Sequence, residues 1–306
     1  MTPMPPDTAL LELGRSLQRE GYRFITPTPA THQRVLQRAP HPARDLRDVF
    51  GWSRPFEPGV LSLQQQACLR DADQLDTDGP LWRARLRFSN LGELLLAHSA
   101  YPTAAADSVF FGPDTYRFCS LLSRWDTGAD TVVDIGAGSG AGGLWLAHLR
   151  PRREVLLTDI NERALALARV NARLAGIEAR TLVSDLFAAL PELPDLCVAN
   201  PPYMKDAGQR SYRDGGGTHG EGLSLRIARE WLERARPGQA LILYTGSAIV
   251  DGRDAIVEGV AALARLHGVS ELRAEEIDPD VFGEELEQPG YDDVERIAAV
   301  GVRLVR

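Results

Sequence analysis

The sequence has few of the residues that build metal centres or disulfide frameworks. Its three cysteines, Cys68, Cys119 and Cys197, are far apart, and neither a CxxC nor an HExxH motif occurs. This pattern excludes a zinc cluster and a disulfide-stabilised scaffold as the basis of function. We therefore expect no bound metal.

Long apolar runs and a targeting segment are also missing. No stretch approaches the roughly 18–20 apolar residues that a membrane-spanning helix needs. The N-terminus, MTPMPPDTALLELG, has no basic segment followed by an apolar one, as a signal peptide would. The 306 residues are 44% hydrophobic and 25% charged, a usual globular mixture. We expect a soluble, cytoplasmic protein of one large domain or two ordinary ones, without membrane association.

Lysine is scarce, and the positive charge, nearly all of it arginine, is unevenly placed. Lys205 is the single lysine, and the net charge is −8, yet the segment 15–54 holds eight arginines against three acidic residues. Such a local basic surface suits an anionic partner, and the alternative is an ordinary solvated face. The overall acidity weighs against tight nucleic-acid binding, which depends on neutralising phosphates.

The chain divides by pattern into three regions. Up to about residue 80 the signals are helical and irregular, and Asp7 and Thr31 are expected to cap two helices. Trp82, Ala84, Leu86 and Phe88 alternate with arginines before the turn signal SNLG, which predicts a β-hairpin. We predict a largely helical N-terminal substrate-recognition domain over 1–80, a hairpin linker over 81–107 and an α/β domain over 108–306.

From Thr131 onward, strands and helices alternate. Asn161 is expected to cap a helix that ends at Gly176. The order predicts a doubly wound, mostly parallel, seven-stranded sheet with helices on both faces. In such sheets ligands bind at the carboxyl ends of the strands. The strands are expected at 131–135, 154–160, 180–185, 196–199, 240–246, 270–277 and 296–305.

A glycine loop, VVDIGAGSGAGG, follows the first of these strands and opens a helix. Gly136, Gly138 and Gly140 allow a tight turn and a close approach of the backbone to a ligand. Asp159, at the end of the next strand, can accept two hydrogen bonds from a ribose diol. Asp134, just before the glycines, can hold an ammonium group.

Two cofactors fit this loop. Gly138, Gly140 and Gly143 satisfy the GxGxxG pattern of a dinucleotide site. Asp134, Gly136, Gly138 and Gly140 satisfy the D-x-G-x-G-x-G pattern of an S-adenosylmethionine site. The loop alone does not choose between them.

The fourth strand, LCVA, ends in Asn200, Pro201, Pro202 and Tyr203. The Asn200 side chain and the Pro201 carbonyl each offer an acceptor, and Pro202 fixes the direction of the peptide between them. Two adjacent acceptors match an –NH2 group, while Tyr203 offers a face on which a planar group can stack. A clamp for a planar amide or amine suits methyl transfer to nitrogen, whereas hydride transfer would leave it unused.

The glycine loop followed by NPPY resembles class I S-adenosylmethionine-dependent methyltransferases that modify amide or exocyclic nitrogen. The order of parts is similar to that of the release-factor glutamine methyltransferases, which have a helical N-terminal domain, a hairpin linker and a Pro-Asp-Thr segment, here Pro113-Asp114-Thr115. The resemblance covers roughly residues 108–306 and implies a Rossmann-like catalytic domain. TPTPATHQRVLQR and FGWSRPF in the N-terminal region, and DPDVFGEEL near the C-terminus, depart from that family.

The resemblance also assigns residues to the cofactor. Asp185 would face the adenine amino group with Phe187 nearby, and Thr115 or Tyr116 would touch the carboxylate end. The Asn200 clamp would hold the acceptor nitrogen, and His219 is either a proton acceptor or an ordinary loop histidine. The loop residues Asp134, Gly136, Gly138 and Gly140 would hold the methionine part, and Asp159 the ribose.

The substrate stays open at this stage. It can be a protein glutamine, an RNA or DNA base contacted through the arginine-bearing N-terminal region, or a small metabolite. The alternative activity is that of a nicotinamide-dependent oxidoreductase.

Overall fold

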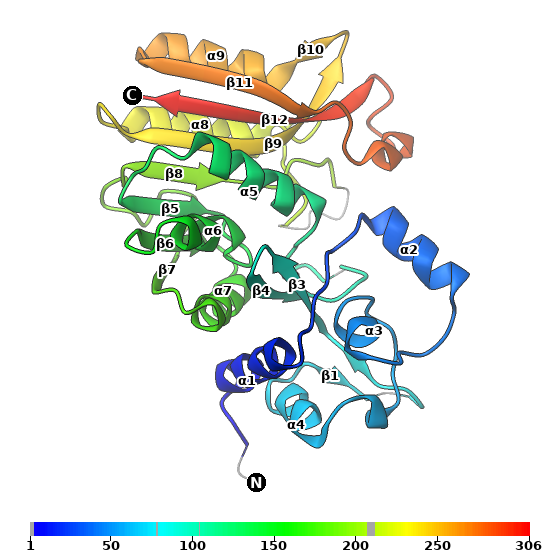
Figure 1. The fold of residues 1–306 in the computed structure, drawn as a ribbon. Helices are drawn as coiled ribbons and strands as arrows, with labels where there is room; N and C mark the ends of the chain where they lie inside the picture. The colour runs from blue at the N-terminus through cyan, green and yellow to red at the C-terminus, as the bar shows by residue number, and fades with distance from the viewer. Residues whose placement is uncertain (1–2, 78, 104, 207–211) are drawn as a thin grey trace.

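The computed structural model describes residues 3–77, 79–103, 105–206 and 212–306. Within them, a central sheet has the strand order β11, β12, β9, β8, β5, β6, β7, and a short β10 pairs with β9 (Figure 1). The strands from β7 to β9 are parallel, and β12 and β11 are antiparallel to their neighbours. The predicted doubly wound, mostly parallel sheet is confirmed. The strands are β5 (Thr131–Ile135), β6 (Glu154–Asp159), β7 (Ala179–Val183), β8 (Leu196–Ala199), β9 (Ala240–Val250), β10 (Arg253–Asp254), β11 (Glu271–Asp278) and β12 (Arg296–Val305).

Helices cover both faces of this sheet. Val132 of β5 belongs to the core built with α5 and α6, whereas the next residue, Val133, belongs to the core built with α8 and α9. Burial on both faces explains why the strand reads as a continuous apolar run. Asn161 caps α7 and Gly176 ends it in a left-handed conformation, as predicted. The helices are α5 (Pro113–Trp125), α6 (Ala141–Leu149), α7 (Glu162–Ala175), α8 (Gly222–Arg234) and α9 (Ala255–His267), with a 3-10 turn η2 (Gly283–Glu287) before β12.

The N-terminal region is largely helical, but the expected caps are wrong. Asp7 lies within the first turn of α1, because a proline at the start places the N-cap at Pro5. Thr28 caps α2 by accepting a hydrogen bond from the Thr31 amide, so Thr31 is already inside the helix. The elements are α1 (Pro6–Arg19), α2 (Pro29–Arg38), α3 (Leu46–Phe50), η1 (Pro58–Val60), α4 (Leu63–Asp71), β1 (Leu75–Asp76) and β2 (Arg83–Ala84).

The predicted hairpin forms from β3 (Leu86–Leu91) and β4 (Leu94–Ser99), and every residue of both strands is buried. It lies between the N-terminal region and the large sheet (Figure 1). The side chain of Asn171, on α7, binds both the amide and the carbonyl of Ala97 at 2.7 and 3.0 Å. The hairpin is therefore an internal wall shared by two cores, and Arg87 is buried although Arg83 and Arg85 are exposed.

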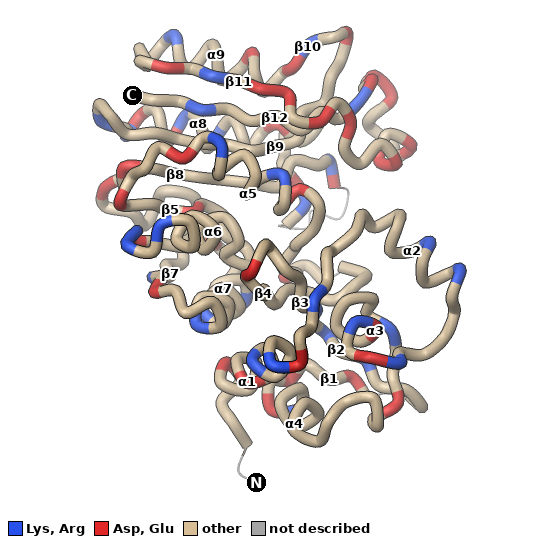
Figure 2. The backbone as a smooth tube through the Cα atoms, viewed as in Figure 1, with Lys and Arg blue, Asp and Glu red and all other residues tan. Residues whose placement is uncertain are grey.

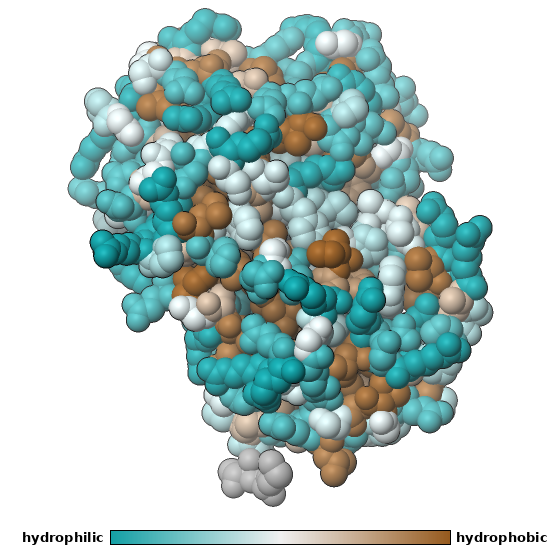
Figure 3. Space-filling model, viewed as in Figure 1, coloured by the Kyte–Doolittle hydropathy of each residue, from teal (hydrophilic) through white to brown (hydrophobic). Residues whose placement is uncertain are grey.

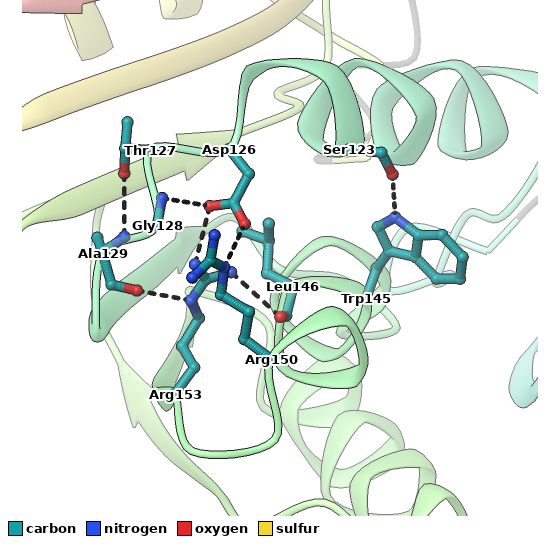
Figure 4. A network of polar contacts seen from close by, with 9 residues as sticks. All are labelled: Ser123, Asp126, Thr127, Gly128, Ala129, Trp145, Leu146, Arg150 and Arg153. Atoms are coloured by element: carbon teal, nitrogen blue, oxygen red, sulfur yellow. Dashed lines mark hydrogen bonds and ion pairs between the residues drawn. The ribbon is translucent and has the colours of Figure 1, made fainter.

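An ion-pair network fixes the end of α5 beside the start of β5 (Figure 4). Asp126 accepts hydrogen bonds from Arg153 at 2.8 Å, Arg150 at 3.1 Å and the Gly128 amide at 3.0 Å. The side chain of Arg153 is fully buried and also donates to the carbonyls of Ala129 and Leu146. Burial alone would raise the pKa of Asp126, but these donors lower it.

The face of the molecule seen in Figure 3 is mostly polar. Figure 3 shows mainly hydrophilic side chains, with the apolar ones in separate patches. Basic residues mark α2, basic and acidic residues lie together at α3, and acidic residues gather around η2 (Figure 2). In the part of the chain that the structure describes, no helix is long and apolar enough to cross a membrane.

Candidate active site

A cavity of about 360 Å³ opens at the carboxyl ends of β5 and β8. These strands are parallel neighbours, and Ile135 is paired in register with Ala199. The next residues along each strand, Gly136 and Asn200, both line the cavity. The glycine loop and the NPPY segment therefore meet in one space, as strand order alone predicts.

The three glycines of the loop have different surroundings. Gly136, Gly138 and Gly140 have φ values of 66°, 55° and 82°, which an L side chain rarely adopts. A Cβ on Gly136 or Gly138 would meet nothing within 4 Å, and both residues border the cavity. Gly140 is not among the lining residues; it packs on the core as the N-cap of α6. Its part is to turn the chain beneath the loop.

Two carboxylates, one buried and one partly buried, order this loop. Asp134 is 2% exposed and accepts the Gly143 amide at 2.8 Å. Burial raises its pKa to about 7, partly offset by that hydrogen bond. Asp159 accepts the amides of Gly138 and Asn161, both at 2.9 Å, and burial raises its pKa as well. Asp134 and Asp159 both line the cavity.

The remaining predicted cofactor residues are placed less uniformly. Asp185 lies at the cavity and is paired through both oxygens with Arg226, at 3.0 and 2.9 Å. Thr115 borders the cavity, and its hydroxyl accepts the Gly112 amide at the start of α5. Phe187 is fully buried in the core against α8 and does not border the cavity. Its side chain packs in the core between the sheet and α8, so any effect on the site is through packing and not through contact with a ligand.

The NPPY segment presents all four residues to the cavity. Tyr203 is nearly buried, at 7% exposed, and its hydroxyl donates to Asp114 at 2.5 Å. Asp114 also accepts from Tyr244 at 2.8 Å. Its pKa is raised by burial and lowered in part by these donors. The ring is thus fixed by its hydroxyl end.

No local pattern in the sequence indicates this anchor. Asp114 belongs to the Pro-Asp-Thr segment at the start of α5, and Arg117 lies one turn further along the same helix, but Tyr203 follows β8 and Tyr244 lies on β9. Arg117 donates to Asp114 at 3.4 Å and to Asp278 at 2.7 Å. Only the fold brings these residues together behind Tyr203.

His219 does not border this cavity. Its Nε2 lies 2.9 Å from Asp293, and the residue lines a separate depression with Glu221 and Ser247. Of the two interpretations, the geometry favours an ordinary loop histidine.

The residues present fit S-adenosylmethionine. Gly136 and Gly138 leave room for a ligand against the backbone. The carboxylates of Asp134 and Asp159, on the same cavity, can accept hydrogen bonds from a ligand. Asp134 suits an ammonium group, since a nearby cation would favour its ionised form. Asp159 suits a diol, although two of its acceptor positions are already used by the loop amides.

Comparisons with known proteins agree with this geometry. A family model described as the methyltransferase small domain matches residues 119–213. The release factor glutamine methyltransferase of Deinococcus radiodurans is 36% identical over 127 residues, which cover 42% of this chain and 44% of that protein. The ribosomal RNA small subunit methyltransferase C of Hamiltonella defensa is 37% identical over 86 residues, or 28% of this chain and 26% of that protein.

Among solved structures, Trm5b from Pyrococcus abyssi superposes with a TM-score of 0.51 at 13% identity, covering 79% of this chain and 68% of the other; this likeness shows the fold. The chain matches less than half the length of the two relatives named above, so their activities do not transfer as a whole. Residues 119–213 match the methyltransferase small domain, and the chain is similar over part of its length to release factor glutamine methyltransferases.

Proposed function

We propose that this protein is an N-methyltransferase that uses S-adenosylmethionine and acts on a planar amide or amino nitrogen. The observation that carries the proposal is the single cavity shared by Gly136, Asp159 and Asn200. A cofactor site on β5 and β6 and an acceptor clamp on β8 are useful to each other only if they open into the same space. The fold satisfies that condition.

Different residues of the cavity would bind different parts of the cofactor and the acceptor. Asp134, Gly136 and Gly138 would hold the methionine part of the cofactor, and Asp159 its ribose. When bound, S-adenosylmethionine supplies an electrophilic methyl group that a nitrogen lone pair can attack, the C–N bond forming as the C–S bond breaks. Asn200 completes the set as the first residue of the clamp.

The clamp prepares the nitrogen for this attack. The Asn200 side-chain oxygen and the Pro201 carbonyl would accept its two N–H bonds, which draws the lone pair out of conjugation and directs it. Tyr203, held by Asp114, limits the plane in which the acceptor group can lie. The nitrogen loses one proton as the reaction finishes, and water at the open side of the cavity can take it.

The acceptor that we infer first is the side-chain amide of a protein glutamine, and the second is an amino group of an RNA base. Of the relatives named above, one is named as a glutamine methyltransferase of release factor and the other as a methyltransferase of ribosomal RNA. Both acceptors are planar –NH2 groups and would fit the same clamp. A small metabolite with such a group is a third possibility that the same experiment tests.

The test is transfer of labelled methyl groups from S-adenosylmethionine into a cell lysate, followed by protease or nuclease digestion. Label that protease releases indicates a protein acceptor, and label that nuclease releases indicates RNA; label in the small-molecule fraction indicates a metabolite. A lysate that takes up no label would contradict the proposal. So would tight binding of NADH combined with no binding of S-adenosylhomocysteine, which would favour an oxidoreductase.

A substitution tests the clamp itself. Asn200→Ala should abolish transfer and leave the affinity for S-adenosylhomocysteine within about twofold, because only the reacting nitrogen depends on that side chain. Gln37→Ala removes another carboxamide, on the exposed face of α2, and should change neither quantity. Loss of cofactor binding in Asn200→Ala would instead assign this residue a structural role.

A further inference from the structure

Arg87 is a buried cation on the wall of the cavity that faces the N-terminal region. It lies on β3, is 4% exposed, and borders the same cavity as Asn200. Its Nε donates to the Ser99 carbonyl at 3.3 Å, and its Nη1 lies 3.4 Å from Nδ1 of His32. Both partners are neutral acceptors at long distances.

Within the described part of the chain, the charge of Arg87 has no counterion. Among the described residues, no carboxylate forms an ion pair with it, whereas Arg213, on the same cavity, pairs with Asp206 at 3.4 Å and with Glu285. Burial lowers the pKa of Arg87 to about 10, which still leaves the side chain charged at neutral pH. A buried cation that lacks a partner is costly, and proteins normally pair such groups.

His32 does not provide that counter-charge. Its Nε2 lies 2.9 Å from the Trp52 carbonyl, which can only accept, so this nitrogen carries the proton and Nδ1 faces Arg87 as an acceptor. Burial, together with Arg87, lowers the pKa of His32 to about 4, so the ring is neutral at pH 7. Tyr101 stacks on this ring at 4.0 Å between centroids. The wall thus holds the guanidinium in place without neutralising it.

We infer that Arg87 binds an anionic group, a carboxylate or a phosphate, that belongs to the substrate whose nitrogen is held at Asn200. The inference rests on the proposed function. A guanidinium offers a planar set of donors that matches either oxyanion with two hydrogen bonds. The bound anion would supply the negative charge that neutralises the Arg87 guanidinium.

The position favours the substrate over the cofactor as the source of the anion. The loop residues that fit the cofactor follow β5 and β6, whereas Arg87, His32 and Tyr101 belong to the hairpin and the N-terminal region. Helix α2, which contributes His32, also carries Arg34 and Arg38 exposed on its surface, without ion pairs among the described residues (Figure 2). The positive potential of these arginines attracts an anionic ligand toward this side of the cavity.

The test uses the full chain and two probes, inorganic phosphate and acetate, titrated calorimetrically at constant ionic strength with and without saturating S-adenosylhomocysteine. The variants are Arg87→Met and Arg87→Lys. Arg85→Met is the matched control, because Arg85 lies two residues away on the same segment with an exposed side chain.

At least one probe should bind the wild-type protein, and Arg87→Met should weaken that binding at least about tenfold. Arg85→Met should bind as the wild type does, and S-adenosylhomocysteine affinity should stay within about twofold in every variant. Preference for phosphate would point to a nucleotide-like substrate, and preference for acetate to a carboxylate. The thermal midpoint of unliganded Arg87→Met should rise, because an uncompensated buried charge is removed.

Three results would overturn the inference: neither probe binds the wild type, a probe binds Arg87→Met as tightly as the wild type, or Arg87→Met loses S-adenosylhomocysteine affinity tenfold or more. The last result would assign the anion to the cofactor. If Arg87→Met does not fold, Arg87→Lys keeps the charge but loses the planar donors, and weaker probe binding is expected there. Failure of the proposed function would appear separately, as absent S-adenosylhomocysteine binding in the wild type.

Discussion

The orientation of Tyr203 depends on a glycine of β9, and one added methyl group there can test it. A Cβ on Gly246 would lie 2.3 Å from both Cδ2 and Cε2 of Tyr203. Carbon atoms make ordinary contact at about 3.5–4.0 Å, so the ring would have to move by roughly 1 Å or more. The hydroxyl resists this movement because Asp114 holds it at 2.5 Å. Gly246 does not have a positive φ, so its backbone conformation is one that alanine can adopt, and the strain expected there comes from the contact with the Tyr203 ring.

We therefore expect Gly246→Ala to reduce methyl transfer by about 100-fold, the typical result of a displacement of about 1 Å in a positioning group. Overfilling of the site should lower the free energy of unfolding by about 1–3 kcal/mol. The affinity for S-adenosylhomocysteine should stay within about threefold, since Gly136 follows β5 and Asp159 ends β6, whereas Gly246 lies on β9. The measurements are single-turnover transfer into the lysate fraction that accepts label, calorimetric titration and urea unfolding.

Gly59→Ala is the control, because a Cβ there meets nothing within 4 Å and φ is not positive. It should leave all three quantities unchanged. A folded Gly246→Ala protein with transfer within about threefold of wild type would refute the idea that the Tyr203 ring positions the acceptor. A parallel loss of cofactor affinity would show instead that the change spreads across the whole cavity.

Two further predictions concern buried charges. Between the usual carboxyl pKa and the value of about 7 at Asp134, the folded state keeps a proton that the unfolded chain releases, so this carboxyl lowers stability as pH rises. Asp134→Asn should therefore be more stable than the wild type at pH 8, by up to roughly 4 kcal/mol, but not at pH 4, while binding S-adenosylhomocysteine more weakly; urea unfolding at both pH values checks this. Asp126→Ala leaves Arg153 buried without its carboxylate and should cost about 3–5 kcal/mol in the same assay at pH 7. Glu192→Ala, which removes an exposed pair with Arg236, should cost less than about 1 kcal/mol, and an equal loss in both variants would contradict the role of burial.

The catalytic half of the fold could be predicted from sequence because its signals are local. The strand from Thr131 to Ile135, the glycines after it and the helix between Asn161 and Gly176 each follow from periodicity, turn residues and caps. Strand order then brings Gly136 and Asn200 to the same edge of the sheet. Local patterns combined with one topological rule were enough to locate the cavity.

What escaped prediction depends on contacts between distant segments. Asp114 meets Tyr203 and Tyr244 only after three elements have assembled, and no spacing in the sequence encodes that meeting. The alternation around Arg87 predicted a hairpin with one arginine face, but the hairpin is enclosed on both sides. Periodicity distinguishes two faces of a strand and cannot tell whether a second layer covers the polar one.

The two walls of the cavity differ in what they determine. The match to the methyltransferase small domain, residues 119–213, covers the wall that, under the proposed function, would hold the cofactor and the clamp and so determine the reaction. His32, Arg87 and Tyr101 lie outside that match and form another wall of the same cavity, where we propose that the substrate binds. A neutral glutamine side chain alone would leave the Arg87 guanidinium uncompensated. Whichever acceptor is methylated, we therefore expect it to carry an acidic group within reach of its reacting nitrogen, so that specificity comes from charge recognition at one wall and reaction type from the other.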